Sequence, residues 1–264
     1  MRGASPWTRR AKRRLIAGAT AAVAVAAGSV VTTDLVAGAD AATPVSSAKW
    51  QTCQVTLNGV TTTVDKSERT RTVVNGTGGS WARVAFYART DSACTFHRVF
   101  ATDGRVGYNG ITDGATRQQG SGTTPAGTFS MTEAFGNSRR PTAMTSAMPF
   151  HRVAAGDWWV EDNTSAFYNQ LRNQSLGGFL LTKTGLNGSE LLQDFGNQYA
   201  YAIVINYNRP PDVATPVRNR GAGIFLHVNG SGATAGCVSA PRAFLRDLMW
   251  RLDPDRVPVL AVGR

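Results

Sequence analysis

One cysteine near the C-terminus lies in a setting that favours nucleophilic chemistry. Cys237 follows Gly236 in a run of small residues, and His227 lies ten residues upstream, within the apolar stretch 224–228. A free thiol has a pKa of about 8.5, so little thiolate exists at neutral pH unless a neighbouring histidine takes the proton. Backbone N–H groups near Gly236 and Cys237 would hold the oxyanion of an attacked carbonyl. The spacing predicts Cys237 as nucleophile and His227 as its general base.

The order of these residues along the chain excludes a papain-like enzyme, in which the cysteine precedes the histidine. His97, His151 and His227 all precede Cys237, so only histidine-first arrangements stay open. We interpret His97 and His151 as ordinary structural or surface histidines. Cys94 and His97 would supply half of a metal site, and the sequence has no second half. The alternative for Cys237 is a buried, inert cysteine.

The three cysteines divide into two and one. Cys53 and Cys94 both lie in the N-terminal β-rich part, whereas Cys237 stands alone. In an exported protein an odd count leaves one thiol over, so Cys53 and Cys94 are the natural pair. Their bridge would close a loop of about 42 residues and stabilise the fold by about 4 kcal/mol. Three cysteines exclude a disulfide-dense scaffold and a zinc site of four thiolates.

The first 41 residues have the pattern of a secretory signal. Residues 2–14 carry six basic side chains and no acid, residues 15–31 are apolar and uncharged, and small residues at A-x-A spacing follow. We expect cleavage after Ala39 or Ala41, by either the general or the twin-arginine export route, and a secreted or cell-envelope location. The alternative is an uncleaved anchor, although glycine, threonine and serine interrupt the apolar run and make it a weak membrane span. The cleaved protein would have no stable membrane span.

The charge balance favours negatively charged partners. The chain has a formal net charge of +11, and residues 1–41 hold six bases and two acids, so +7 stays on the remainder. A basic exported protein would be attracted to anionic polymers of the cell envelope. The alternative is that a modest positive charge only aids solubility. Nucleic acid is excluded as a partner because no basic cluster interleaves with aromatic residues. The 42% hydrophobic and 17% charged residues exclude a disordered polyelectrolyte.

The remaining chain divides into a short linker, residues 42–49, and one β-rich domain, residues 50–264. Hydrophobic patterns predict strands over 81–87, 95–100, 199–206, 224–228 and 257–262, the last with Pro258 near a sheet edge. A turn is expected over 75–80 and a long functional loop over 107–127. The clearest helix is 241–252, starting near Ser239 or Ala240, and its N-terminus would favour a thiolate a few residues upstream.

Two motifs resemble the L,D-transpeptidase catalytic domain, also called the YkuD type. The first is a histidine on a strand, a variable loop and a Ser/Thr-His-Gly-Cys turn, matched here by His227, Thr234, Gly236 and Cys237. The second is a TPxGxF-like segment at 122–129. Further stretches typical of one branch of the family are 105–110, 157–162, 168–169 and 189–191. The resemblance covers about 81–264, and residues 42–80 match it poorly.

The resemblance implies a mostly β, sandwich-like fold with a short C-terminal helix before the last strand, and peptidoglycan stem peptides as substrate. Cys237 would attack the amide between the third and fourth residues of a donor stem, releasing D-alanine and forming a thioester. The amine of a neighbouring stem's diamino acid would resolve it as a 3→3 cross-link, and water would give carboxypeptidase action. His227, oriented by a backbone carbonyl or by Asn229, would act as base and then acid. No metal or organic cofactor is needed.

Two positions depart from the family pattern. Ala235 stands where most members have histidine, and Ser239 stands where they have arginine or asparagine. Loss of that polar group from the site leaves substrate choice and rate open. The same departures support the alternative of a non-catalytic wall-binding protein that retains the fold. A sortase-like enzyme is disfavoured because its Thr-Leu-x-Thr-Cys strand and its longer His–Cys spacing are both missing.

Overall fold

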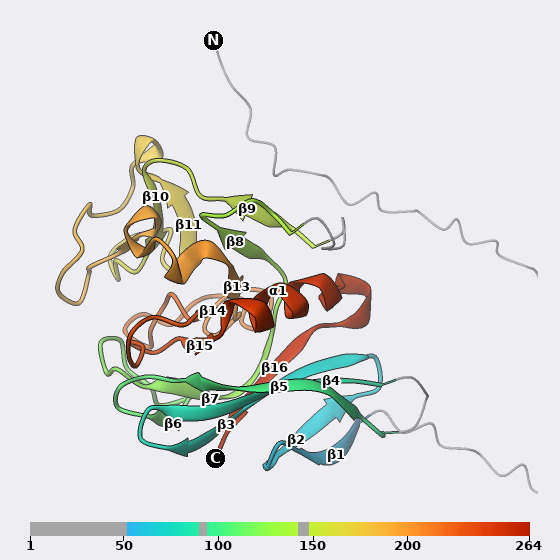
Figure 1. The fold of residues 1–264 in the computed structure, drawn as a ribbon. Helices are drawn as coiled ribbons and strands as arrows, with labels where there is room; N and C mark the ends of the chain where they lie inside the picture. The colour runs from blue at the N-terminus through green and yellow to red at the C-terminus, as the bar shows by residue number, and fades with distance from the viewer. Residues whose placement is uncertain (1–51, 90–93, 142–147) are drawn as a thin grey trace, which may run out of the picture. The chain divides into compact units, whose positions relative to one another are not determined.

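The computed structural model describes residues 52–89, 94–141 and 148–264, and most of its regular elements are strands (Figure 1). The predicted leader, 1–41, and the predicted linker, 42–49, lie outside the described residues. In the described part of the chain, no helix has the length and apolar character needed to cross a bilayer.

Eleven strands form one sheet in the order β6-β7-β16-β3-β4-β5-β15-β14-β13-β8-β9. Their bounds are β3 Thr70–Gly78, β4 Trp81–Ala88, β5 His97–Arg105, β6 Ile111–Asp113, β7 Thr124–Ser130, β8 Ala134–Gly136, β9 Phe150–Arg152, β13 Ala202–Val204, β14 Phe225–Val228, β15 Val238–Ala240 and β16 Val259–Gly263. A hairpin pairs β1 (Thr52–Leu57) with β2 (Val60–Asp65). A third sheet holds β10 (Asp157–Val160), β11 (Gln170–Asn173) and β12 (Glu190–Leu191). The helical elements are α1 (Arg242–Arg251) and four 3-10 turns, η1 Gln174–Leu176, η2 Leu192–Phe195, η3 Gln198–Ala200 and η4 Pro254–Arg256.

Helix α1 fills the space between the two halves of the large sheet (Figure 1). Its apolar stripe, including Leu245 and Leu248, lies in one buried cluster with Phe86 of β4 and Leu226 of β14. Burying a leucine side chain stabilises a fold by about 1.5–3 kcal/mol, so the stripe explains where the helix docks. The mostly β fold with a short helix before the last strand is therefore confirmed.

The helix begins later than the sequence predicted. Ser239 belongs to β15, and Pro241 occupies the position just before the first helical residue. The three residues of β15 separate Cys237 from Pro241, and the four steps between them rise about 13 Å. Because a helix dipole acts within its first turn, the expected support of a thiolate by α1 is wrong.

Several strand limits also differ from the predictions. β3 continues through Gly76 to Gly78 with a bulge, so the turn predicted over 75–80 is shorter. Within the predicted strand 199–206, only Ala202–Val204 forms a paired strand, β13, and η3 forms a 3-10 turn up to Ala200. The predicted loop 107–127 contains β6 and the start of β7. Pro258 is not near a sheet edge: β16 lies between β7 and β3, and the proline directly precedes it.

The β1–β2 hairpin covers the face of β3 and β4 that points away from α1. Leu57 and Val60 of the hairpin pack with Val73, Ala85 and Tyr87 in a separate buried cluster. Both faces of β4 are therefore covered, which explains why its alternating pattern has apolar residues on both sides.

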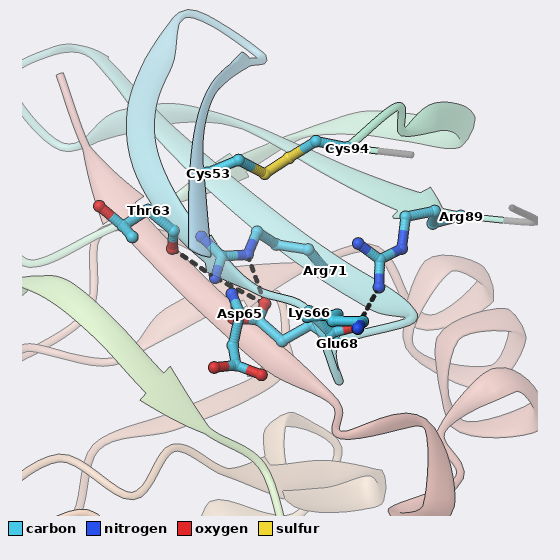
Figure 2. The surroundings of a disulfide bond; sticks show 8 residues. All are labelled: Cys53, Thr63, Asp65, Lys66, Glu68, Arg71, Arg89 and Cys94. Atoms are coloured by element: carbon cyan, nitrogen blue, oxygen red, sulfur yellow. Dashed lines mark hydrogen bonds and ion pairs between the residues drawn. A yellow bond between two sulfur atoms is a disulfide. The ribbon is translucent and has the colours of Figure 1, made fainter. Parts of the chain in front are cut away.

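A disulfide joins Cys53 of β1 to Cys94, with 6.5 Å between the two Cα atoms (Figure 2). The predicted pairing is thus confirmed, and the bridge fits an extracytoplasmic protein. Near it, the buried guanidinium of Arg71 donates to Glu68 Oε2 at 2.6 Å and to the Thr63 carbonyl oxygen at 3.0 Å (Figure 2). This pairing satisfies a charge that would otherwise be costly to bury.

Candidate active site

Two neighbouring strands bring His227 and Cys237 to one cavity. His227 lies on β14, and Cys237 immediately precedes β15, which pairs with β14 in parallel. Alternate residues of a strand share a face, so His227 points to the same side as Phe225. Phe225 packs with Cys237, and the ring of Tyr199 lies 5.3 Å from the His227 ring. His227, Tyr199 and Cys237 all line a cavity of about 220 Å³.

The Cys237 thiol is buried and lies within hydrogen-bond distance of two backbone groups. Its Sγ donates to the Gly223 carbonyl oxygen at 3.2 Å and accepts from the Phe225 amide at 3.3 Å. Burial raises the pKa of Cys237 well above its usual value, and the negative charge of Glu190 raises it further, while the Phe225 amide opposes both effects. Only 7% of the residue is exposed. Burial therefore favours the neutral thiol over the thiolate at this position.

His227 is neutral and has one ring nitrogen fixed. Its Nδ1 lies 2.9 Å from the Val228 carbonyl oxygen, and since a carbonyl only accepts, Nδ1 carries the proton. Nε2 therefore keeps a lone pair. Burial lowers the pKa of His227 to about 4, against the opposing effect of the Val228 hydrogen bond. Asn229, the other group considered for orienting this ring, has a buried Oδ1 that meets no hydrogen-bond partner in the described residues.

The turn before the thiol is held by hydroxyl groups from both family-like motifs. Thr234 Oγ1 donates to the Cys237 carbonyl oxygen at 2.6 Å and accepts from the Gly236 amide at 3.2 Å. Thr124 Oγ1, from the TPxGxF-like segment, donates to the same carbonyl at 3.2 Å. The two motifs thus meet at the backbone of the cysteine. The Gly236 N–H, expected near an oxyanion, is engaged within the turn.

A buried arginine that was not predicted from the sequence packs against the turn at Gly236. Arg117 is 6% exposed, and its Nε donates to the Thr123 carbonyl oxygen at 2.7 Å. A Cβ at Gly236, where φ is +151°, would lie 2.7 Å from Arg117 Nη2. Glycine is therefore required there for the guanidinium to approach. The sequence feature that could have identified Arg117 is its place in the segment 107–127, which was expected to be a functional loop.

Two carboxyl groups lie beside the thiol. Glu190 lines the cavity, and the Tyr199 hydroxyl donates to its Oε2 at 2.6 Å. Burial raises the pKa of Glu190 to about 7, although the Tyr199 hydrogen bond opposes this. Glu161 packs against the backbone of Gly223, and burial together with the charge of Glu190 raises its pKa well above the usual value. Both residues belong to stretches typical of the family, but their position beside the thiol was not predicted.

The remaining predicted residues divide into those at the cavity and those outside its lining. Ala235 is exposed and lines the cavity, whereas Ser239 is fully buried in β15 and does not. The Ser239 hydroxyl meets no hydrogen-bond partner within the described residues. His97 and His151 are not among the lining residues, and His151 Nε2 lies 2.7 Å from Asp157. In the described ranges, no three His, Cys, Asp or Glu side chains gather in a way that would hold a metal.

The family model of the L,D-transpeptidase catalytic domain (YkuD) matches residues 59–259. This match spans most of the chain, which therefore belongs to the L,D-transpeptidase family, whose members act on peptidoglycan peptides. The match begins at the β1–β2 turn, so the expectation that residues 42–80 match the family poorly is wrong for 59–80. No curated protein and no solved structure matched the chain.

Proposed function

We propose that this protein is an exported cysteine-nucleophile L,D-transpeptidase that forms 3→3 cross-links between peptidoglycan stems through a thioester. The observation that carries this proposal is a cavity shared by a buried thiol and a neutral histidine with a free Nε2 lone pair. Family membership supplies the substrate class. The disulfide and the leader-like N-terminal segment support export.

Acylation starts from a neutral pair. The Cys237 S–H, which donates to Gly223 at rest, turns toward His227 Nε2 when a donor stem fills the cavity. Sγ attacks the carbonyl of the third stem residue while its proton passes to Nε2. His227 then gives that proton to the amine of the leaving D-alanine, and the thioester remains. Since burial disfavours both charged forms, proton transfer accompanies attack and no separated ion pair precedes it.

We assign the oxyanion of this step to the amide of Cys237. The Gly236 amide donates to Thr234 and therefore keeps the turn in shape. Arg117 lies beneath Gly236, and its positive charge opposes the rise in the pKa of Cys237. In this proposal Arg117 takes over part of the polar support that Ser239 lacks compared with other family members.

Deacylation decides between two products. The neutral amine of a neighbouring stem's diamino acid attacks the thioester, His227 receives the amine proton and returns it to Sγ, and an amide cross-link forms. Attack by water releases a shortened stem, which is carboxypeptidase action. Both routes use the same acyl-enzyme.

The test is digestion of tetrapeptide muropeptides with detection of free D-alanine and of cross-linked dimers. The wild-type protein should release D-alanine, and Cys237→Ala should release none. Mass spectrometry with a carbapenem should show an adduct on the wild type, and an adduct that persists on Cys237→Ala would refute the nucleophile. Binding to peptidoglycan without any D-alanine release would support a non-catalytic wall-binding protein. The observation that favours this alternative is that Ser239, which stands where most family members have arginine or asparagine, is buried.

A further inference from the structure

The cavity at Cys237 contains one group that ionises near neutral pH. The lining has hydroxyl, amide and small side chains together with Cys237, His227, Tyr199 and Glu190. At neutral pH the raised pKa of Cys237 leaves a thiol, and the lowered pKa of His227 leaves a neutral ring. The pKa of Tyr199 is also raised, mainly by burial, which leaves a phenol. Negative charge in this lining therefore comes from Glu190, on a protein whose overall charge is +11.

The Glu190 carboxyl is held in place without a protein cation. Its backbone is fixed by the pairing of β12 with β10, where Glu190 lies opposite Trp159. One oxygen accepts the Tyr199 hydroxyl at 2.6 Å, and no lysine, arginine or histidine of the described chain forms an ion pair with it. A partly buried carboxylate without a counter-ion is unfavourable, and a bound cation would offset that cost.

We propose that Glu190 binds the ammonium group of the diamino acid in a peptidoglycan stem. This inference rests on the proposed function. The carbonyl attacked by Cys237 belongs to the diamino acid of the donor, and the amine that resolves the thioester belongs to the diamino acid of the acceptor. Both bring an ammonium to the cavity that Glu190 and Cys237 share. The acceptor's ammonium then gives one proton to the Glu190 carboxylate, so that the amine attacks the thioester in its neutral form. Glu190 is thus a specificity-determining residue for stems with a free amino group.

Tyr199 connects this charge to the reacting pair. Its hydroxyl fixes the carboxyl of Glu190, and its ring packs edge-on against His227 at 5.3 Å and against Phe225 at 5.7 Å. A stem whose ammonium is held at Glu190 is therefore placed relative to the base and the thiol by one rigid aromatic side chain. Charge-assisted hydrogen bonds have the strength and direction required for such positioning.

The experiment combines one substitution with one chemical change in the substrate. Rates of D-alanine release are measured with a native tetrapeptide stem and with the same stem N-acetylated on its diamino acid, for wild type and Glu190→Gln. A hydrogen bond to a charged group corresponds to a change of about tenfold or more. If Glu190 holds the donor ammonium, acetylation should slow D-alanine release by the wild type about tenfold, and Glu190→Gln should be equally slow with both stems.

Two arms separate the sources of the ammonium. If the donor ammonium binds, the preference appears in kcat/KM for D-alanine release. If the acceptor ammonium binds, D-alanine release is unchanged, and acetylating only the acceptor or introducing Glu190→Gln lowers the ratio of cross-linked to hydrolysed product. Either result supports the role of Glu190. An equal preference for free over acetylated amines in wild type and Glu190→Gln, in both arms, would overturn it.

Two further variants keep the outcome clear. Asp194→Asn removes one carboxylate charge from the neighbouring η2 turn, where Asp194 is exposed and paired with Lys183 outside the cavity lining, and it should keep the wild-type preference. Glu190→Asp keeps the charge and should retain part of the preference, which separates loss of the ammonium contact from a general loss of folding. No D-alanine release by the wild type from either stem would refute the proposed function itself, whereas release with an unchanged preference would refute only Glu190.

Discussion

The hydroxyl of Thr124 donates to the carbonyl oxygen of Cys237 over 3.2 Å. The same hydroxyl accepts the amide of Gly107 at 2.8 Å, so one buried side chain connects three segments of the site. The TPxGxF-like motif therefore supports the turn at Cys237. Its threonine contributes backbone order at the cysteine, and its glycine and phenylalanine lie further along β7.

Replacing Thr124 should weaken both the fold and the site. Thr124→Val keeps the shape but leaves the Gly107 amide buried without its acceptor, which costs about 1–3 kcal/mol. The free energy of unfolding in urea should fall by that amount, and carbapenem acylation should slow. Thr128→Val, at an exposed position of the same strand, loses a solvent-exposed hydroxyl contact with Thr62 and is the control; it should leave acylation unchanged and cost much less stability. Equal stability of Thr124→Val and the wild type would contradict the supporting role.

The glycine before Cys237 is required by packing. In Gly236→Ala the new methyl group would meet Arg117 Nη2 at 2.7 Å, and the backbone φ of +151° is unfavourable for alanine. We expect a loss of about 1–3 kcal/mol in unfolding free energy and a slower acylation, because the guanidinium must move. Gly78→Ala, outside the cavity lining, has a similarly unfavourable φ of +129° but its methyl meets nothing within 4 Å, so it is the matched control for acylation. If both variants acylate at the wild-type rate, Arg117 does not hold the turn.

The lowered pKa of His227 should be visible in the pH dependence of the acylation rate. Because burial lowers the pKa of His227 to about 4, the ring stays a base at pH values where an ordinary histidine is half protonated. The rate of carbapenem acylation should therefore stay level as pH falls from 7 to about 5, and decrease only near the lowered pKa of the ring. Stopped-flow acylation across this range measures it. A rate that halves near pH 6.5 would show that His227 titrates normally in the working enzyme.

Glu190 should make stability fall as the solution becomes more alkaline. Its pKa is raised to about 7 in the folded chain, so the protonated form favours folding, and this contribution is lost as pH rises from about 4.5 through about 7. Glu161, Tyr199, His227 and Cys237 surround it. Glu190→Gln cannot ionise there, so the unfolding free energy of wild type minus variant should decrease between pH 5 and pH 8. His227 acts in the opposite direction in both proteins and cancels. If this difference in unfolding free energy did not change with pH, the Glu190 carboxyl would titrate as it does in water, which would contradict its burial.

The sequence predicted the elements that depend on local pattern. The alternation in β4, the apolar run of β14 and the stripe of α1 each arise from neighbouring side chains that share a face, and the structure contains all three. The short turn with Gly236 and Cys237 is also local. The limits of β13 were not predictable in this way, because Tyr199 is apolar and β-prone but packs in a 3-10 turn against Phe195.

The support of the site depends on contacts between distant segments. Arg117 reaches Gly236, and Glu190 reaches the cavity at Cys237, only because the order of strands in the sheets places their segments together. No local periodicity encodes that order. Identification of His227 and Cys237 therefore needed only spacing and motif, whereas the carboxyl and guanidinium groups around them needed the fold. The single-domain boundary at 50–264 and the roles of the site residues stay predictions.

The disulfide should stabilise the fold without contributing to the chemistry. Cys53 and Cys94 anchor β1, whose hairpin covers β3 and β4 away from the cavity, while Cys237 is the free cysteine of the described chain. A bridge across this separation stabilises by about 4 kcal/mol on the chain-entropy model. The double variant Cys53→Ala/Cys94→Ala should lose about that much unfolding free energy, yet acylate at the wild-type rate below its melting temperature. Thiol titration of the unfolded, unreduced wild type should find one free group at Cys237. Finding three would refute the pairing, and slow acylation by the folded double variant would show that the hairpin acts on the site.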